Sequence, residues 1–222
     1  MIPHLIPNVA ARQELPWSHD FNASAASDEA LSRPSDRVFL ALQPPPAIAA
    51  RAYRIGQNVR DMHGLRCSLI DAERLHLSLL GFRGHQALSP ATIDAIFGAV
   101  ATVVMPQFRL ELNRMMRFGQ KRDSEPDDRR NRPIVLIGDD LTTPGIVMLR
   151  QHIIDALRKA GCSGAIPSSF NPHMTLFWDR HDLDEQAIEE LSWTARDFVL
   201  VRSYHGLGKH EVLGRWPLQT TV

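Results

Sequence analysis

The sequence lacks several features that would place the protein in a special class. Its two cysteines, Cys67 and Cys162, are too few for a disulfide framework and have no metal-ligand spacing. Its longest nearly apolar run, residues 95–105, is far shorter than the roughly 20 residues that span a membrane. Lys plus Arg and Asp plus Glu number 25 each, which leaves no positive field for coating long nucleic acids. We therefore expect no membrane association and a reducing, cytoplasmic location.

The beginning of the chain has no sustained apolar periodicity. Residues 1–35 are rich in Ala, Ser, Pro, Asn and Asp, and they lack the basic and apolar segments of a secretory signal. We expect them to form a disordered extension that is dispensable for folding. Residues 36–222 are long enough to bury a sizeable core and are expected to form a single domain.

The remaining chain alternates between strand-like and helix-like apolar patterns. Strands are expected at residues 37–42, 74–82, 107–115, 132–139, 171–179, 196–203 and 210–218. Helices are expected at residues 45–61, 89–104, 143–161 and 182–192. The sequence YHGLGK predicts a hairpin turn, and the charged run at 119–132 predicts a solvated loop whose arginines could still reach a polyanionic ligand.

The order of strands and helices occurs twice. A buried strand precedes His76 by 38 residues, and another precedes His173 by 39 residues. Such near-equal spacing indicates two duplicated units. We expect two lobes, at approximately 36–118 and 132–218, packed around a pseudo-twofold axis with a shared cleft.

Both central strands carry a histidine followed two residues later by a hydroxyl, as HLSL at 76–79 and HMTL at 173–176. Because side chains alternate along a strand, His76 shares a face with Ser78, and His173 shares a face with Thr175. One histidine on a strand is more often structural than catalytic. Two at matching positions of a repeat indicate a functional site.

Two imidazoles facing each other across a cleft suit acid–base chemistry, because histidine titrates near pH 6.5. One ring can accept a proton while the other donates one. The hydroxyls of Ser78 and Thr175 can donate hydrogen bonds to the oxygens of a tetrahedral anion. The set predicts in-line displacement at a phosphodiester, with no metal needed.

The two motifs, about a hundred residues apart, resemble the signature motifs of the 2H phosphoesterase superfamily. The chain is most similar to its bacterial 2′-5′ RNA ligase and RNA 2′,3′-cyclic phosphodiesterase (LigT-like) branch, over roughly residues 36–218. The opening RVFLALQPP and the closing FVLVRSYHGLGKHEVLGRWPL contribute to the likeness. The resemblance implies an α+β, bilobal fold with two antiparallel sheets facing a central cleft and helices outside.

The resemblance also implies a metal-independent phosphodiesterase without a cofactor. Its substrates would be RNA ends or nucleotide 2′,3′-cyclic phosphates, and we expect a monomer. His76 would donate a proton to the departing 3′ oxygen, and His173 would accept one from water. Ser78 and Thr175 would bind the phosphate, and the product would be a 2′-phosphate.

Some positions depart from the common pattern. Ser78 replaces the more frequent threonine, and Phe177-Trp178 stand where close relatives often place a basic residue. The candidates for a cation that supports the phosphate are Arg74, Arg180 and Arg202. Phe177 and Tyr204 are candidates for stacking on a base, with ordinary packing as the alternative.

Other functions stay open at this point. A metallohydrolase would need three or four converging ligands, and no HExxH or HxH spacing occurs. A non-catalytic module could bind a nucleotide or cyclic phosphate in the same cleft, although binding does not require two proton-transfer groups. Ligation, and cleavage of ADP-ribose cyclic phosphate or 2′-5′ oligonucleotides, would use the same four residues. The further histidines, including His210 beside the final hairpin, are expected at the surface.

Overall fold

The computed structural model describes residues 37–82, 90–119, 131–139, 143–162, 170–204 and 206–220. The predicted N-terminal extension and most of the predicted charged loop lie outside these ranges. The strands are β1 (Arg37–Leu42), β2 (Leu77–Phe82), β3 (Phe108–Arg117), β4 (Arg132–Ile137), β5 (Met174–Asp179), β6 (Gln186–Ala195), β7 (Asp197–Tyr204) and β8 (Lys209–Pro217). The helices are α1 (Pro46–Met62), the short 3-10 helix η1 (Ala72–Arg74), α2 (Pro90–Val100) and α3 (Pro144–Lys159).

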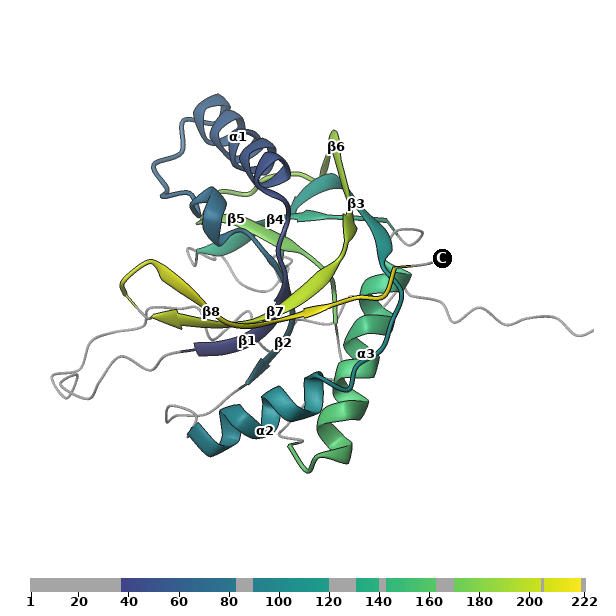
Figure 1. Ribbon diagram of the computed structural model, residues 1–222. Coiled ribbons are helices and arrows are strands. Elements are labelled where there is room, and N and C mark those ends of the chain that lie inside the picture. Colours follow the sequence, from purple (N-terminus) through teal and green to yellow (C-terminus); the bar gives the residue numbers. More distant parts are fainter. Residues whose placement is uncertain are drawn as a thin grey trace, which may run out of the picture.

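The eight strands form one sheet in the order β6-β3-β4-β5-β2-β1-β7-β8 (Figure 1). All neighbouring strands are antiparallel. The two halves of four strands meet where β2 lies beside β5, through the pairing of Leu77 with Met174. The expected α+β fold with antiparallel strands is therefore confirmed. The two sheets that we expected are the halves of one continuous sheet, because this central pairing joins them.

The halves of the sheet do not follow the order of the chain. β3 lies between β4 and β6, in the half that contains the second motif, whereas β7 and β8 lie beside β1 in the half that contains the first. Consecutive strands tend to be neighbours, and this applies to β3 with β4 and to β7 with β8. The segments 36–118 and 132–218, expected as lobes, are thus interleaved in the sheet.

One face of the sheet is covered by helices. α1 packs against β5 and β6, α3 packs against β2 and β3, and α2 packs against α3 (Figure 1). Leu75, Leu77 and Leu79 lie on this face and are buried in the main core, as the alternation predicted. In the described ranges no helix is both long and apolar enough to cross a membrane.

The opposite face carries two smaller apolar clusters, one in each half of the sheet. The cluster on β1 and β7 consists of Phe39, Ala41, Val199 and Val201. The cluster on β3 and β4, with the residue that follows β3, consists of Met116, Phe118, Val135 and Ile137. Because no described helix packs on this face, it is the open side of the sheet on which a site can form.

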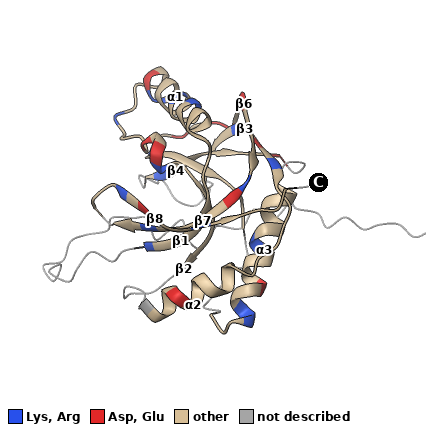
Figure 2. Ribbon diagram, in the orientation of Figure 1, with Lys and Arg blue, Asp and Glu red and all other residues tan. Residues whose placement is uncertain are grey.

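The helix expected at residues 182–192 is wrong, because this segment contains most of β6. Its acidic side chains suit a helix, but Leu191, Trp193 and Ala195 are buried with the period of two of a strand. Its carboxylates pair with arginines of β3, Glu185 with Arg114 and Glu190 with Arg109. These opposite charges lie along the β3–β6 edge (Figure 2). Cross-strand pairing therefore overrides local helix propensity here.

Candidate active site

His76 and His173 occupy equivalent positions, each immediately before its motif strand. The Nδ1 atom of His76 lies 2.7 Å from the carbonyl oxygen of Arg74, two residues earlier in the chain. The Nδ1 atom of His173 lies 2.8 Å from the carbonyl oxygen of Asn171, also two residues earlier. A carbonyl can only accept, so Nδ1 carries the proton in both rings. The Nε2 atom is therefore the nitrogen that each ring has left for proton exchange.

The strand register brings the two motifs together. Leu77 pairs with Met174, and both side chains are fully buried on the helix-covered face. Continuing this antiparallel register by one residue sets His76 opposite Thr175, and Ser78 opposite His173. The four predicted site residues therefore share the open face of the sheet, at the junction of its two halves.

Both motif strands are irregular at the same position. The pairing of β2 with β1 shifts between Ser78 and Leu80, and the pairing of β5 with β4 shifts between Thr175 and Phe177. Each strand thus has a bulge at the residue after its hydroxyl, Leu79 or Leu176. Bulges redirect the side chains around them and often lie near functional sites.

The backbone at each bulge is held by a partner from elsewhere in the chain. The Nε atom of Arg150, a buried residue of α3, donates to the carbonyl of Leu79 at 3.1 Å. The backbone N–H of Ile70 donates to the carbonyl of Leu176 at 2.8 Å. These two hydrogen bonds satisfy carbonyls at the irregular positions and fix the bulges in place.

The bulge at Leu176 changes the predicted faces of β5. Phe177 was expected on the face of His173, as a possible stacking residue, but it is fully buried in the main core. Trp178, which strict alternation would place in the core with Met174, is only half-buried. The extra residue reverses the alternation after Thr175, so Phe177 cannot stack on a substrate base.

The surroundings of the two histidines differ. The ring of His76 stacks on Phe39, with centroids 4.7 Å apart, and lies edge-to-face with His210 at 5.4 Å. The ring of His173 lies edge-to-face with Phe118 at 4.7 Å. His76 therefore has a second imidazole beside it, that of His210, whereas His173 has the apolar ring of Phe118 beside it.

Sequence reasoning missed all three of these neighbours. Phe39 and Phe118 were not singled out from the sequence, and His210 was expected at the surface. The register of the β7–β8 hairpin would have predicted the position of His210. A turn that pairs Tyr204 with Lys209 also pairs Ser203 with His210, which places this ring on the face of Val201 and Phe39.

Burial shifts both catalytic candidates toward their neutral forms. Loss of solvent, together with the charges of His173 and Arg74, lowers the pKa of His76 to about 4, although the hydrogen bond to the Arg74 carbonyl raises it. Burial also lowers the pKa of His173 below its ordinary value. The pairing of Leu77 with Met174 brings the two rings near enough for the charge of His173 to act on His76. Both rings are neutral at pH 7 in the protein alone.

Two other predicted contacts lie away from this face. Arg202 and Tyr204 lie on the other face of β7, in register with Glu211 and Lys209. Tyr204 donates to the Glu211 carboxylate at 2.5 Å, and Arg202 lies 4.0 Å from it. Arg180 is exposed beyond the end of β5, about 16 Å along the strand from Thr175. Of the predicted cations, Arg74 alone is brought to the histidines.

The remaining site features concern the hydroxyls and metal ligands. In the part of the chain that the structure describes, neither Ser78 nor Thr175 uses its hydroxyl to bind another residue. Ser78 is exposed and Thr175 is half-buried. Across the same ranges, no three His, Cys, Asp or Glu side chains gather as a possible metal site.

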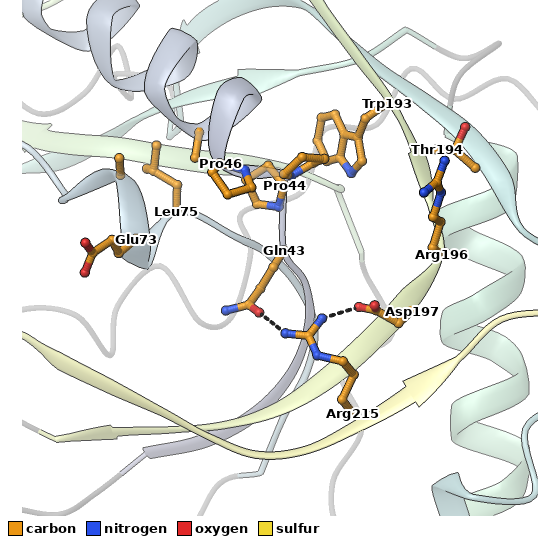
Figure 3. A pocket seen from close by; sticks show the side chains of 13 residues that line it. Gln43, Pro44, Pro46, Glu73, Leu75, Trp193, Thr194, Arg196, Asp197 and Arg215 are labelled. Carbon is orange, nitrogen blue, oxygen red and sulfur yellow. Dashed lines mark hydrogen bonds and ion pairs between the residues drawn. The ribbon is translucent and has the colours of Figure 1, made fainter.

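A cavity of about 640 Å³ lies between the start of α1, the η1 segment up to Leu75, and the junction of β6 with β7 (Figure 3). Pro44, Pro46 and Trp193 line one side. On another side, Arg215 donates to Asp197 at 2.6 Å and to Gln43 at 3.0 Å. No residue of the HLSL or HMTL motif lines this cavity, whereas the four predicted site residues share the open face of the sheet.

A family model of the 2′-5′ RNA ligase superfamily matches residues 42–206, a range that includes both motifs. The chain belongs to this superfamily. The resemblance to LigT-like 2H phosphoesterases is thereby confirmed, and membership supports a phosphoesterase activity. A search of curated proteins found no match.

Several solved structures have a similar fold. E. coli LigT in complex with NADP+ has a TM-score of 0.62 and 23% identity, covering 85% of this chain and 99% of LigT. LigT with 3′-AMP has a TM-score of 0.60 and 22% identity, with the same coverage. The protein TT0787 of Thermus thermophilus has a TM-score of 0.61 and 20% identity, covering 83% of this chain and 98% of that one. At these identities the likeness shows a shared fold.

Proposed function

We propose that this member of the 2′-5′ RNA ligase superfamily hydrolyses 2′,3′-cyclic phosphates to 2′-phosphates without a metal ion. The observation that carries the proposal is the matched pair of His76 and His173. Each ring anchors Nδ1 on a carbonyl and leaves Nε2 for proton exchange, with a hydroxyl of the other motif opposite. Such a pair supplies an acid and a base on either side of one phosphate.

In the proposed reaction, Nε2 of His173 accepts a proton from water while the water oxygen attacks phosphorus. The bond from phosphorus to the 3′ oxygen breaks, and protonated His76 gives its proton to that oxygen. Ser78 and Thr175 donate hydrogen bonds to the non-bridging oxygens, where negative charge grows. Each turnover leaves His76 neutral and His173 protonated, and proton exchange with solvent restores both rings.

The family resemblance assigns His76 as the donor, and the charges near it support this direction. The positive charge of Arg74 lowers the pKa of His76, so the protonated ring is a stronger acid. The free protein holds little of this form at pH 7. A bound anionic phosphate favours the charged imidazolium and raises its pKa, so the bound substrate promotes protonation of His76.

Nucleotides are the substrate class that we favour. E. coli LigT has been solved with 3′-AMP, with ATP and with NADP+, which shows nucleotide binding by that protein. For this chain we infer RNA ends or nucleotides with a 2′,3′-cyclic phosphate. Ligation would be the same displacement with a 5′-hydroxyl in place of water, and it would leave a 2′-5′ linkage.

The test is turnover by the full chain in excess chelator. Cyclic nucleotides, cyclic-ended oligonucleotides with and without a 5′-hydroxyl acceptor, and ADP-ribose cyclic phosphate form the panel, and phosphorus NMR identifies each product. We expect 2′-phosphates to form at an unchanged rate with chelator. Activity that disappears on chelation and returns with zinc or manganese would contradict the mechanism. Binding of these compounds without turnover of any would identify a binding module instead.

A further inference from the structure

A third imidazole lies at the first-motif side of the site. His210 is on β8, and its ring centroid is 5.4 Å from that of His76 and 5.6 Å from that of Phe39. Both contacts are edge-to-face, and the residue is half-buried. Among the described residues, none forms a hydrogen bond with either ring nitrogen of His210. The ring therefore has two nitrogens available on the open face of the sheet.

The motif strands themselves bring no cation to the phosphate. After Thr175, β5 continues with Leu176 and Phe177, which are buried. After Ser78, β2 continues with apolar residues and Gly81. Cationic side chains that pair with an anion on the open face must therefore come from neighbouring elements.

Arg74 and His210 can supply that charge together. The positive charge of Arg74 acts on both His76 and His210. Its guanidinium reaches the β7–β8 turn, because a Cβ atom added at Gly208 would lie 3.5 Å from Arg74 Nη1. Arg74, His76 and His210 thus form one cluster of groups that are cationic or can become so.

The acidic groups nearby are turned away or occupied. Glu211, the next residue on β8, binds Tyr204 and Arg202 on the other face, and Lys209 lies over the Tyr204 ring. Asp71 lies 3.9 Å from Arg74 and is itself exposed. The charges that act on His210 are those of His76, which immediately precedes β2, and of Arg74 in η1. Burial, with these two charges, lowers the pKa of His210 to about 4.

We propose that His210, together with Arg74, binds the substrate phosphate from the β8 side and takes up a proton when the phosphate arrives. This inference rests on the proposed function and deepens it, because it identifies His210 and Arg74, on the His76 side of the site, as the cationic groups that bind the phosphate. An anion placed beside three positive groups favours the charged form of each ring. The ligand class is a phosphate ester whose non-bridging oxygens face β8.

The experiment uses inorganic phosphate as the probe and needs no turnover. Histidine NMR signals of the full chain are followed against pH with and without phosphate, and calorimetry at pH 6 in two buffers of different ionisation heat counts the protons taken up. We expect phosphate to raise the pKa of His210 along with that of His76. His210→Gln should weaken phosphate binding about tenfold, the usual scale for one charge-assisted hydrogen bond, and should reduce proton uptake.

His63→Gln is the matched control, because His63 is exposed beyond the end of α1. It should bind phosphate as the wild type does. With a cyclic nucleotide, His210→Gln should raise KM more than it lowers kcat. The inference is wrong if phosphate shifts the signals of His76 and His173 but not that of His210, or if His210→Gln binds phosphate normally. Binding at His210 without hydrolysis of any cyclic phosphate would instead reject the proposed function and keep the anion site.

Discussion

Leu77 pairs with Met174 at the point where the two halves of the sheet meet. The two side chains are buried on the helix-covered face, so the side chains of the residues flanking them lie on the open face. Through this pair, motifs that are 97 positions apart in the sequence (His76 to His173) become neighbours across two strands. The geometry of the site therefore depends on one stretch of backbone pairing.

The hydroxyls should contribute less than the histidines. Ser78→Ala and Thr175→Val each remove one hydrogen bond to the phosphate, so each should lower kcat/KM roughly 10- to 100-fold, from about 1.5–3 kcal/mol for a charge-assisted bond. Thr175→Ser keeps the hydroxyl and should retain most activity. Steady-state kinetics on a cyclic nucleotide measures these effects. Full activity in Thr175→Val would show that this hydroxyl does not bind the phosphate.

The pH dependence should show an acidic optimum. The reaction needs His76 protonated and His173 neutral, and both pKa values lie below 6.5 in the free protein. We expect kcat/KM to peak below pH 6.5 and to fall about tenfold per unit well above both pKa values. The kcat profile should lie at higher pH, because the bound phosphate raises the pKa of His76. A kcat/KM that is constant from pH 5 to pH 8 would contradict these assignments.

Arg74→Met offers a further check on that profile. Removal of the positive charge should raise the pKa of His76 and move the alkaline limb of kcat/KM upward.

The free energy of unfolding should fall on acidification. The pKa values of His76 and His210 are lowered to about 4, so the unfolded chain binds more protons than the native protein between pH 6.5 and pH 4. This contribution to stability is complete above pH 6.5 and is lost as pH falls toward 4. Urea unfolding at several pH values measures it. The His76→Asn/His210→Asn double variant should lose less stability over this window, and an equal loss would show that the rings are not the cause.

Arg150 should stabilise the bulge of β2. Arg150→Met keeps the apolar stem but leaves the Leu79 carbonyl without its donor, so we expect a loss of about 1–3 kcal/mol in the free energy of unfolding. Activity should fall as well, since Ser78 precedes the bulge. Arg158→Met, an exposed change on the same helix, is the control and should cost little. Equal stability of the two variants would mean that Arg150 does not hold the bulge.

Much of the fold was readable from local patterns. The positions of β1 and β4, and of the helices that begin at Pro46 and Pro144, follow from short apolar runs and from proline at the first helical position. The same period of two placed His76 with Ser78 and His173 with Thr175. These features depend on residues close together in the sequence.

Features that depend on distant partners were not predictable in this way. β6 is a strand because β3 supplies arginines and backbone pairing to an acidic segment. Phe177 lies in the core because a bulge at Leu176, held by Ile70, reverses the alternation. His210 reaches the site only through the position of β8 beside β7. The pseudo-twofold relation of the two units stays a prediction.

The rate of cyclic-phosphate hydrolysis by His76→Ala, His173→Ala and the double variant, in excess chelator, tests the central claim most directly. Thermal unfolding should first show that each variant is folded. Each single change should cost on the order of 10² to 10⁴ in kcat/KM, the usual worth of positioned proton transfer. The double variant should lose far less than the product of the two, because both rings act in one transition state. A folded His173→Ala protein that hydrolyses the substrate at nearly the wild-type rate would contradict the account.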